Sequence, residues 1–211
     1  ILVHSDIADT EELLPSYFFR DITRWPHHEI DMLSRVRGTV LEIGAGVGSH
    51  VIELQKRGHQ VTANEASPVC CKIMQERGVQ TILPGDCLEI QGKYETVVLI
   101  MNGLGMAETP NGLVALLKKL RSLLTSDGQI LLDASDIGFL HEPELNLQVQ
   151  HNDNYYGIVT HQFEYCGNLG KSFQWLFVDK VLLKETAQSL NLNVTILNED
   201  KQFGYTAMLN L

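Results

Sequence analysis

The part of this sequence best suited to bind a ligand is a glycine-rich turn that directly follows a short apolar segment containing one acidic residue. Residues 39–43 hold Glu42 inside a short apolar run, and Gly44, Gly46 and Gly48 follow at once. Such a turn between a strand and a helix lets a ligand approach the backbone and directs free N–H groups at it. A tight connection without a ligand is the plainer alternative, but three glycines behind an acid favour a ligand site.

Two further acids come after the next two expected strands. Glu65 lies 19 positions after Gly46, close to the spacing of about 20 at which an acid holds ribose hydroxyls in nucleotide sites. Asp86 could accept a hydrogen bond from an exocyclic amine such as that of adenine. Taken singly, Glu65 could be a solvated acid and Asp86 a turn residue. Together with the glycines, they indicate a nucleoside site.

The residues around the turn help to distinguish between two kinds of nucleoside ligand. The dinucleotide fingerprint needs glycine or alanine at position 49, where this chain has Ser49. The Glu42 carboxylate would repel a pyrophosphate, whereas it can receive the ammonium group of an amino-acid moiety. This pattern favours a nucleoside that carries an amino acid and disfavours a nicotinamide-dependent oxidoreductase.

Alternating strands and helices must position these residues. We expect strands at 39–43, 60–64, 79–83, 95–101, 129–133, 193–197 and 203–211, and helices at 49–57, 68–77, 113–124 and 179–190. Gly58, Gly78 and Gly128 are expected to end three of the helices. This alternation predicts a parallel sheet covered on both faces, with ligands at the carboxyl ends of its strands.

The flanking segments are rich in aromatic residues. Residues 1–38 look helical in pieces, with helix-start chemistry over 9–15. The segment 16–25 is either a helix packed on the sheet edge or a lid whose Tyr17 and Arg20 face a ligand. Residues 155–165 and 172–178 predict a hairpin. Its Tyr155 and Tyr156 are, like Tyr17 and Arg20, candidate substrate or lid residues. If the two segments close a pocket, replacing Tyr17, Arg20 or Tyr156 should weaken the binding of substrate or cofactor and leave the fold intact.

Residues 40–48 resemble the first motif of class I S-adenosylmethionine-dependent methyltransferases, and Glu65, residues 85–87 and the strand ending at Met101 and Asn102 resemble the motifs that follow. Residues 15–38 and 155–211 resemble a little-characterised bacterial branch of small-molecule type. The resemblance implies an α/β, Rossmann-like, doubly wound seven-stranded sheet, mostly parallel with an antiparallel last strand, plus the hairpin insertion and an N-terminal helical cap. It also implies S-adenosylmethionine as cofactor, held by Glu42, Gly44, Ala45, Gly46, Gly48, Glu65, Ala66, Gly85, Asp86, Cys87, Met101 and Asn102.

One domain is expected over residues 1–211. It would consist of a helical cap (1–38), a cofactor-binding core (39–134), an insertion with the hairpin (135–178) and a C-terminal helix and strand pair (179–211). The absence of Met at position 1 leaves room for missing N-terminal residues. A homodimer is possible. In the alternative of a non-catalytic module, the hairpin aromatics would form a dimer or partner interface, and any bound nucleoside would be structural.

The composition excludes several classes of function. A net charge of −10 opposes nucleic-acid and anionic-membrane binding. Four cysteines without a C-x-x-C pair suit a reducing cytoplasm, and neither a metal site nor a membrane span is indicated. Asn102 begins Asn-Gly-Leu-Gly, which differs from the Asn-Pro-Pro-aromatic segment of nucleobase and glutamine methyltransferases, so a small-molecule acceptor is favoured.

Methyl transfer from a sulfonium needs alignment of the nucleophile and exclusion of water. A general base is needed only if the nucleophile starts protonated. His50, beside the glycine turn, and His161, in the hairpin, are weak candidates for that base, because a lone histidine is more often structural or solvated.

Overall fold

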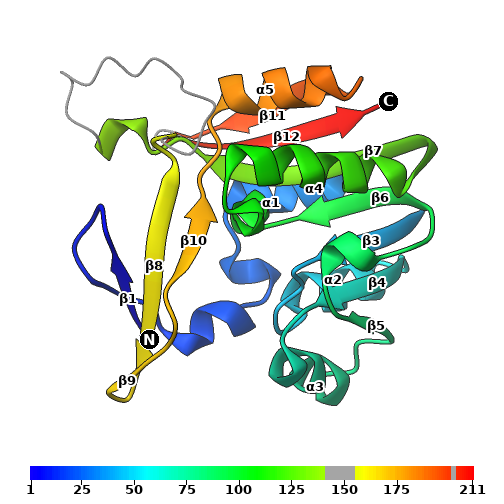
Figure 1. The fold of residues 1–211 in the computed structure, drawn as a ribbon. Helices are drawn as coiled ribbons and strands as arrows, with labels where there is room; N and C mark the ends of the chain where they lie inside the picture. The colour runs from blue at the N-terminus through cyan, green and yellow to red at the C-terminus, as the bar shows by residue number, and fades with distance from the viewer. Residues whose placement is uncertain (141–154, 201–202) are drawn as a thin grey trace.

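The computed structural model describes residues 1–140, 155–200 and 203–211. A seven-stranded sheet with the order β11-β12-β7-β6-β3-β4-β5 forms its centre (Figure 1). Its strands are β3 (Thr39–Ile43), β4 (Gln60–Glu65), β5 (Thr81–Pro84), β6 (Tyr94–Leu99), β7 (Leu124–Ser135), β11 (Asn193–Glu199) and β12 (Gly204–Asn210).

The topology of this sheet confirms the predicted fold class. β3, β4, β5, β6 and β7 are parallel, and β12 is antiparallel to both of its neighbours, β7 and β11. Strand order reverses between β3 and β6, because the chain adds β4 and β5 on one side of β3 and returns to its other side for β6. A crevice for ligands is expected at the carboxyl ends of the strands at this point.

Helices bury both faces of the sheet. α1 (His27–Ser34), α2 (Ser49–Lys56) and α3 (Pro68–Glu76) cover one face through Met32, Leu54 and Met74. α4 (Pro110–Ser122) and α5 (Lys180–Ser189) cover the other through Leu117 and Leu183. Because side chains alternate along a strand, each core strand must be apolar on both sides, which explains the nearly continuous apolar runs in the sequence.

A small antiparallel sheet stands beside the central one. It is built from β1 (Leu2–Ser5), β2 (Glu11–Glu12), β8 (Ile158–Tyr165), β9 (Asn168–Leu169) and β10 (Phe173–Leu176). In Figure 1, β8 and β10 run across the direction of β6 and β7. The predicted hairpin is therefore confirmed as β8 to β10, whereas its pairing with the N-terminal strand β1 was not predicted.

The expected helix start at 9–15 is wrong. Glu11 and Glu12 pair with β1 as strand β2, and the chain then forms two short 3₁₀ helices, η1 (Pro15–Phe19) and η2 (Ile22–Arg24), before α1. Local helix-start chemistry is overridden here because the backbone finds partners in a strand from elsewhere in the sheet.

Glycine ends two of the three helices for which it was predicted. Gly58 and Gly78 follow α2 and α3 with left-handed φ values of +89° and +87°. Gly128 does not end α4, which ends at Ser122. The chain enters β7 at Leu124, which pairs with Tyr94, and a register irregularity follows.

The loop after β6 continues into η4 (Gly103–Ala107), which fastens the small sheet to the central one. A Cβ atom on Gly105 would lie 2.0 Å from Nε1 of Trp175 in β10, so only glycine fits under the indole. The remaining 3₁₀ helices are η3 (Cys87–Glu89) and η5 (Gly138–Leu140). Residues 141–154 of the expected insertion lie outside the described residues.

Candidate functional site

The glycine turn between β3 and α2 is left-handed at three positions. Gly44, Gly46 and Gly48 have φ values of +66°, +56° and +79°. A Cβ atom on Gly48 would lie 2.9 Å from the Met74 side chain, so this glycine is needed for close packing. A Cβ atom on Gly46 would meet nothing within 4 Å, so the turn is open there to an approaching ligand.

Glu65 at the end of β4 lies directly against this turn. Its Oε2 accepts a hydrogen bond from the Gly46 N–H at 2.8 Å, and its Oε1 accepts one from the Ser67 N–H at 2.8 Å. The spacing of 19 residues therefore corresponds to a contact in space. An ionised carboxylate has about four acceptor sites, so Glu65 can still receive ligand hydroxyls.

The residues after β5 lie at the same edge. Gly85 donates its N–H to the Glu65 carbonyl, and Asp86 Oδ1 accepts from the Leu88 N–H at 2.9 Å. Burial, reinforced by the charge of Asp86, raises the pKa of Cys87 to about 11, so this thiol stays neutral. The exposed Ala66 directly follows Glu65. The structure thus brings the predicted groups after β3, β4 and β5 together.

Glu42 belongs to a buried chain of charged groups. Its Oε1 lies 3.6 Å from His50 Nδ1, and His50 Nε2 lies 3.3 Å from Glu29 Oε2. Glu29 Oε1 in turn lies 2.5 Å from Arg20 Nη2. The Trp25 ring packs on His50 with centroids 4.5 Å apart. These contacts connect the segment before α1 to strand β3, and none of the pairs was predicted from the sequence.

Two buried atoms in this chain of charged groups lack a hydrogen-bond partner, Arg20 Nε and Glu42 Oε2. Glu42 is 3% exposed, and its Oε2 is buried without a hydrogen bond. A buried carboxylate oxygen that lacks a donor is costly unless a ligand supplies one. Glu42 Oε2 is therefore a candidate acceptor for a cationic group of a ligand.

The carboxylates around His50 set its protonation. Burial by itself lowers the pKa of His50, but its hydrogen bonds to Glu29 and Glu42 outweigh burial and raise the pKa to about 9. At neutral pH the ring is an imidazolium that faces a carboxylate on each side. A protonated ring has no lone pair to accept a proton, so the geometry favours a positioning role for His50 over a general base.

This arrangement makes stability depend on pH. The stabilising contribution of His50 is complete below its unfolded pKa of 6.5 and is lost as pH rises through about 9. We expect the free energy of unfolding, measured by urea denaturation, to fall between pH 6.5 and 9.5, and we expect His50→Gln to remove most of this fall. His27→Gln, which alters an exposed histidine, is the control. An NMR titration midpoint for His50 at or below 6.5 would contradict the arrangement.

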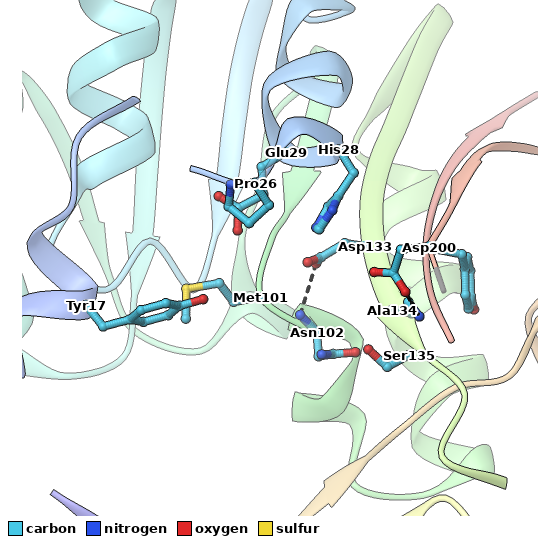
Figure 2. A pocket seen from close by; sticks show the side chains of 12 residues that line it. Tyr17, Pro26, His28, Glu29, Met101, Asn102, Asp133, Ala134, Ser135 and Asp200 are labelled. Carbon is cyan, nitrogen blue, oxygen red and sulfur yellow. Dashed lines mark hydrogen bonds between the residues drawn. The ribbon is translucent and has the colours of Figure 1, made fainter. Parts of the chain in front are cut away.

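A cavity of about 270 Å³ opens beside this chain of charges (Figure 2). It lies between the start of α1, the carboxyl ends of β6 and β7, and the start of β12. Its lining residues are Tyr17, Pro26, His28, Glu29, Met101, Asn102, Asp133, Ala134, Ser135, Asp200, Gly204 and Tyr205. Tyr17, Met101 and Asn102 were predicted as site residues. Asp133 was missed, although it is the last residue of the predicted strand 129–133 and so belongs to the same sheet edge.

Asp133 holds the turn that follows β6. Met101 and Asn102 are left-handed, with φ values of +62° and +56°, and Asp133 Oδ1 accepts a hydrogen bond from the Asn102 N–H at 3.0 Å. Burial raises the pKa of Asp133 to about 7. Non-glycine residues in this conformation are uncommon and concentrate at functional sites.

Four residues predicted to contact the substrate, form a lid or act as a base, namely Arg20, Tyr155, Tyr156 and His161, do not line the cavity. Arg20 is 6% exposed and stacks on the Tyr17 ring at 3.9 Å while pairing with Glu29. The hydroxyls of Tyr155 and Tyr156 donate to Asp179 and Asp136, respectively, and His161 packs against Phe173 in the small sheet. Their contacts are those of groups that join elements of the fold.

Within 1–140, 155–200 and 203–211, no three histidine, cysteine or acidic side chains are grouped so as to hold a metal ion. In the same ranges, no helix has the length and apolar character needed to cross a membrane.

Comparison with solved structures gives clear matches. The chain superposes over 100% of its length, and 86% of the other chain, on an S-adenosylmethionine-dependent methyltransferase from Bacteroides fragilis solved with S-adenosyl-L-homocysteine, at 29% identity and a TM-score of 0.90. A methyltransferase from Clostridium acetobutylicum (12% identity, 91% and 92% covered, TM-score 0.63) and CcbJ from Streptomyces caelestis (13%, 89% and 93%, 0.66) share the fold. No protein-family model matches the chain, and no curated protein matches it.

The sheet order, the antiparallel β12 and the glycine turn at the strand reversal define the class I methyltransferase fold. Together with the motifs at Glu42, Gly44–Gly48 and Glu65 and the match over the whole chain, they identify this protein as a class I S-adenosylmethionine-dependent methyltransferase. The resemblance noted in the sequence is thereby confirmed.

Proposed function

We propose that this methyltransferase transfers a methyl group from S-adenosylmethionine to a small-molecule acceptor by in-line displacement. The observation that carries the proposal is the convergence of Glu42, the glycine turn and Glu65 at one sheet edge, beside a cavity walled by Met101 and Asn102. Met101 and Asn102 would then separate a cofactor, bound at the carboxyl ends of the strands, from a methyl acceptor bound in the cavity.

The residues present fit this cofactor. The unpartnered Glu42 Oε2 would receive the ammonium of its methionine part, next to the open backbone at Gly46. Glu65 would hold the ribose hydroxyls, and Asp86 with the neutral Cys87 would border the adenine. When bound, the cofactor supplies an electrophilic methyl on a sulfonium, and the chain aligns the acceptor and excludes water.

The size and charge of the chain support a small acceptor. A cavity of about 270 Å³ suits a small molecule, and the net charge of −10 opposes nucleic-acid binding. A homodimer through the hairpin stays a prediction, motivated by Phe163, Tyr165 and Leu169, which are 44%, 61% and 62% exposed. A cytoplasmic location also stays a prediction.

Calorimetric titration tests the cofactor directly. We expect S-adenosylhomocysteine to bind and NAD to bind weakly or not at all. Glu65→Gln should weaken the binding of S-adenosylhomocysteine at least about tenfold, because charged hydrogen bonds to hydroxyls are each worth roughly 1.5–3 kcal/mol. Glu89→Gln, an exposed change in η3, should leave it unchanged. Tight binding of NAD alone would refute the proposal.

A further inference from the structure

The cavity beside the cofactor crevice presents one buried acceptor that lacks a donor, Asn102 Oδ1, and one carboxylate that lacks a cationic partner, Asp133. Asp133 is 9% exposed, lines the cavity, and has no lysine, arginine or histidine nitrogen within 4.0 Å among the described residues. Asn102 Oδ1 is buried without any hydrogen-bond partner, and Asn102 lines the same cavity. Buried acceptors are normally satisfied. A cationic ligand with several N–H donors would give Asn102 Oδ1 a donor and Asp133, which already accepts from the Asn102 N–H, a counter-charge.

The charges around the cavity also favour a cationic ligand. Glu29, Asp133 and Asp200 contribute carboxylates, and no lysine or arginine is found among the described lining residues. Glu29 already has Arg20 and His50 as partners. Asp133 has no such cation, so its negative charge is the one that a cationic ligand would neutralise.

We propose that the methyl acceptor is an amine, bound as its ammonium form against Asp133 and Asn102 at the end of β6 and β7. An ammonium group offers up to three donors, whereas a hydroxyl offers one and a carboxylate none. The proposal rests on the proposed function, because it names the acceptor class of the same site.

Asp133 also suits the proton transfer that an amine requires. The carboxylate takes one proton from the bound ammonium, which frees the nitrogen lone pair. That pair forms the new N–C bond as the methyl–sulfur bond breaks, and the electrons of the broken bond stay on sulfur. Asp133 then passes its proton to solvent. A buried carboxyl whose pKa is raised to about 7 accepts a proton more readily than an ordinary aspartate does.

Other titratable groups line the cavity with Asp133 or act on its charge. They are His28 and Glu29 on α1, Tyr205 on β12, Asp200 before β12, Tyr17 on η1 and His50 on α2. Figure 2 shows His28 and Asp133 pointing toward each other, with Asn102 and Ser135 on the adjoining wall. Asp127, which is exposed on the same strand β7 and does not line the cavity, offers a matched control for Asp133.

The test supplies cofactor labelled in its methyl group and three pools built on the same set of carbon skeletons, as primary amines, alcohols and carboxylic acids. We expect label in the amine pool. Asp133→Asn should lower kcat for the accepted amine about a hundredfold or more, as loss of a general base does. Asp127→Asn, the same change at an exposed position of β7 outside the cavity, should change it less than about threefold. Calorimetry should show S-adenosylhomocysteine binding kept in both variants.

Two further measurements distinguish a direct role of Asp133 and Asn102 in the reaction from a purely structural role. The pH profile of kcat/KM should show a limb near 7 that Asp133→Asn removes. Asn102→Gly keeps the left-handed turn but removes the unpartnered oxygen, so KM for the amine should rise about tenfold with little change in kcat. Label in the alcohol or acid pool alone, or in no pool while S-adenosylhomocysteine binds, overturns the amine assignment. Failure to bind S-adenosylhomocysteine overturns the proposed function and this inference with it.

Discussion

Glu42→Gln should weaken the binding of S-adenosylhomocysteine at least about thirtyfold, because loss of one partner from a buried, hydrogen-bonded charge pair costs 2–5 kcal/mol. Glu42 Oε2 has no donor in the protein itself, so its electrostatic value is realised when a cationic ligand arrives. A glutamine keeps the shape of the side chain and removes the charge.

The same change should weaken ligand binding far more than it lowers the free energy of unfolding. An unsatisfied buried carboxylate oxygen is unfavourable in the free protein, and His50 keeps Glu29 as a partner after the substitution. Calorimetry gives the dissociation constant, and urea denaturation gives the free energy of unfolding. Glu76→Gln, an exposed change on α3, is the control. Equal affinity in Glu42→Gln and the unmodified chain would show that Glu42 does not receive the cofactor's ammonium.

Arg20→Ala is expected to reduce the free energy of unfolding by about 3–5 kcal/mol, the cost of removing one member of a buried ion pair. The side chains of Arg20 and Glu29 are 5% and 3% exposed and lie 2.5 Å apart. Without Arg20, Glu29 keeps only the imidazolium of His50. The loss is a large share of the 5–15 kcal/mol typical of a domain.

This result would differ from the sequence-based expectation that Arg20 can be replaced without harm to the fold. Urea denaturation at 25 °C measures it, with Arg24→Ala, an exposed arginine of the same segment, as the matched control. If Arg20→Ala lay within about 1 kcal/mol of Arg24→Ala, the pair would behave like an exposed ion pair, and its burial would not govern its energy.

The parts of the site that the sequence predicts are those that follow from strand ends. Glu65 and Gly46 are 19 positions apart and still touch, because a parallel sheet brings the carboxyl ends of neighbouring strands together. Asp133 ends a predicted strand in the same way, so it could have been included by the same rule.

The buried ion pairs could not be predicted in this manner. Arg20, Glu29, His50 and Glu42 come from four different elements, and no periodic pattern along the chain marks one as the partner of another. The strand at Glu11 and Glu12 was missed for a related reason. Its partner strand β1 is itself held by β8, far along the chain, whereas helix-start signals are local.

The pairing of β1 with β8 bears on the order in which the molecule folds. His4 and Glu164 are 160 positions apart and lie within 3.0 Å through their side chains. Contacts between residues so distant in sequence require closure of a very long loop, which slows their formation. We therefore expect the central sheet through β7 to form first during synthesis, with the N-terminal strand waiting unpaired until the hairpin emerges.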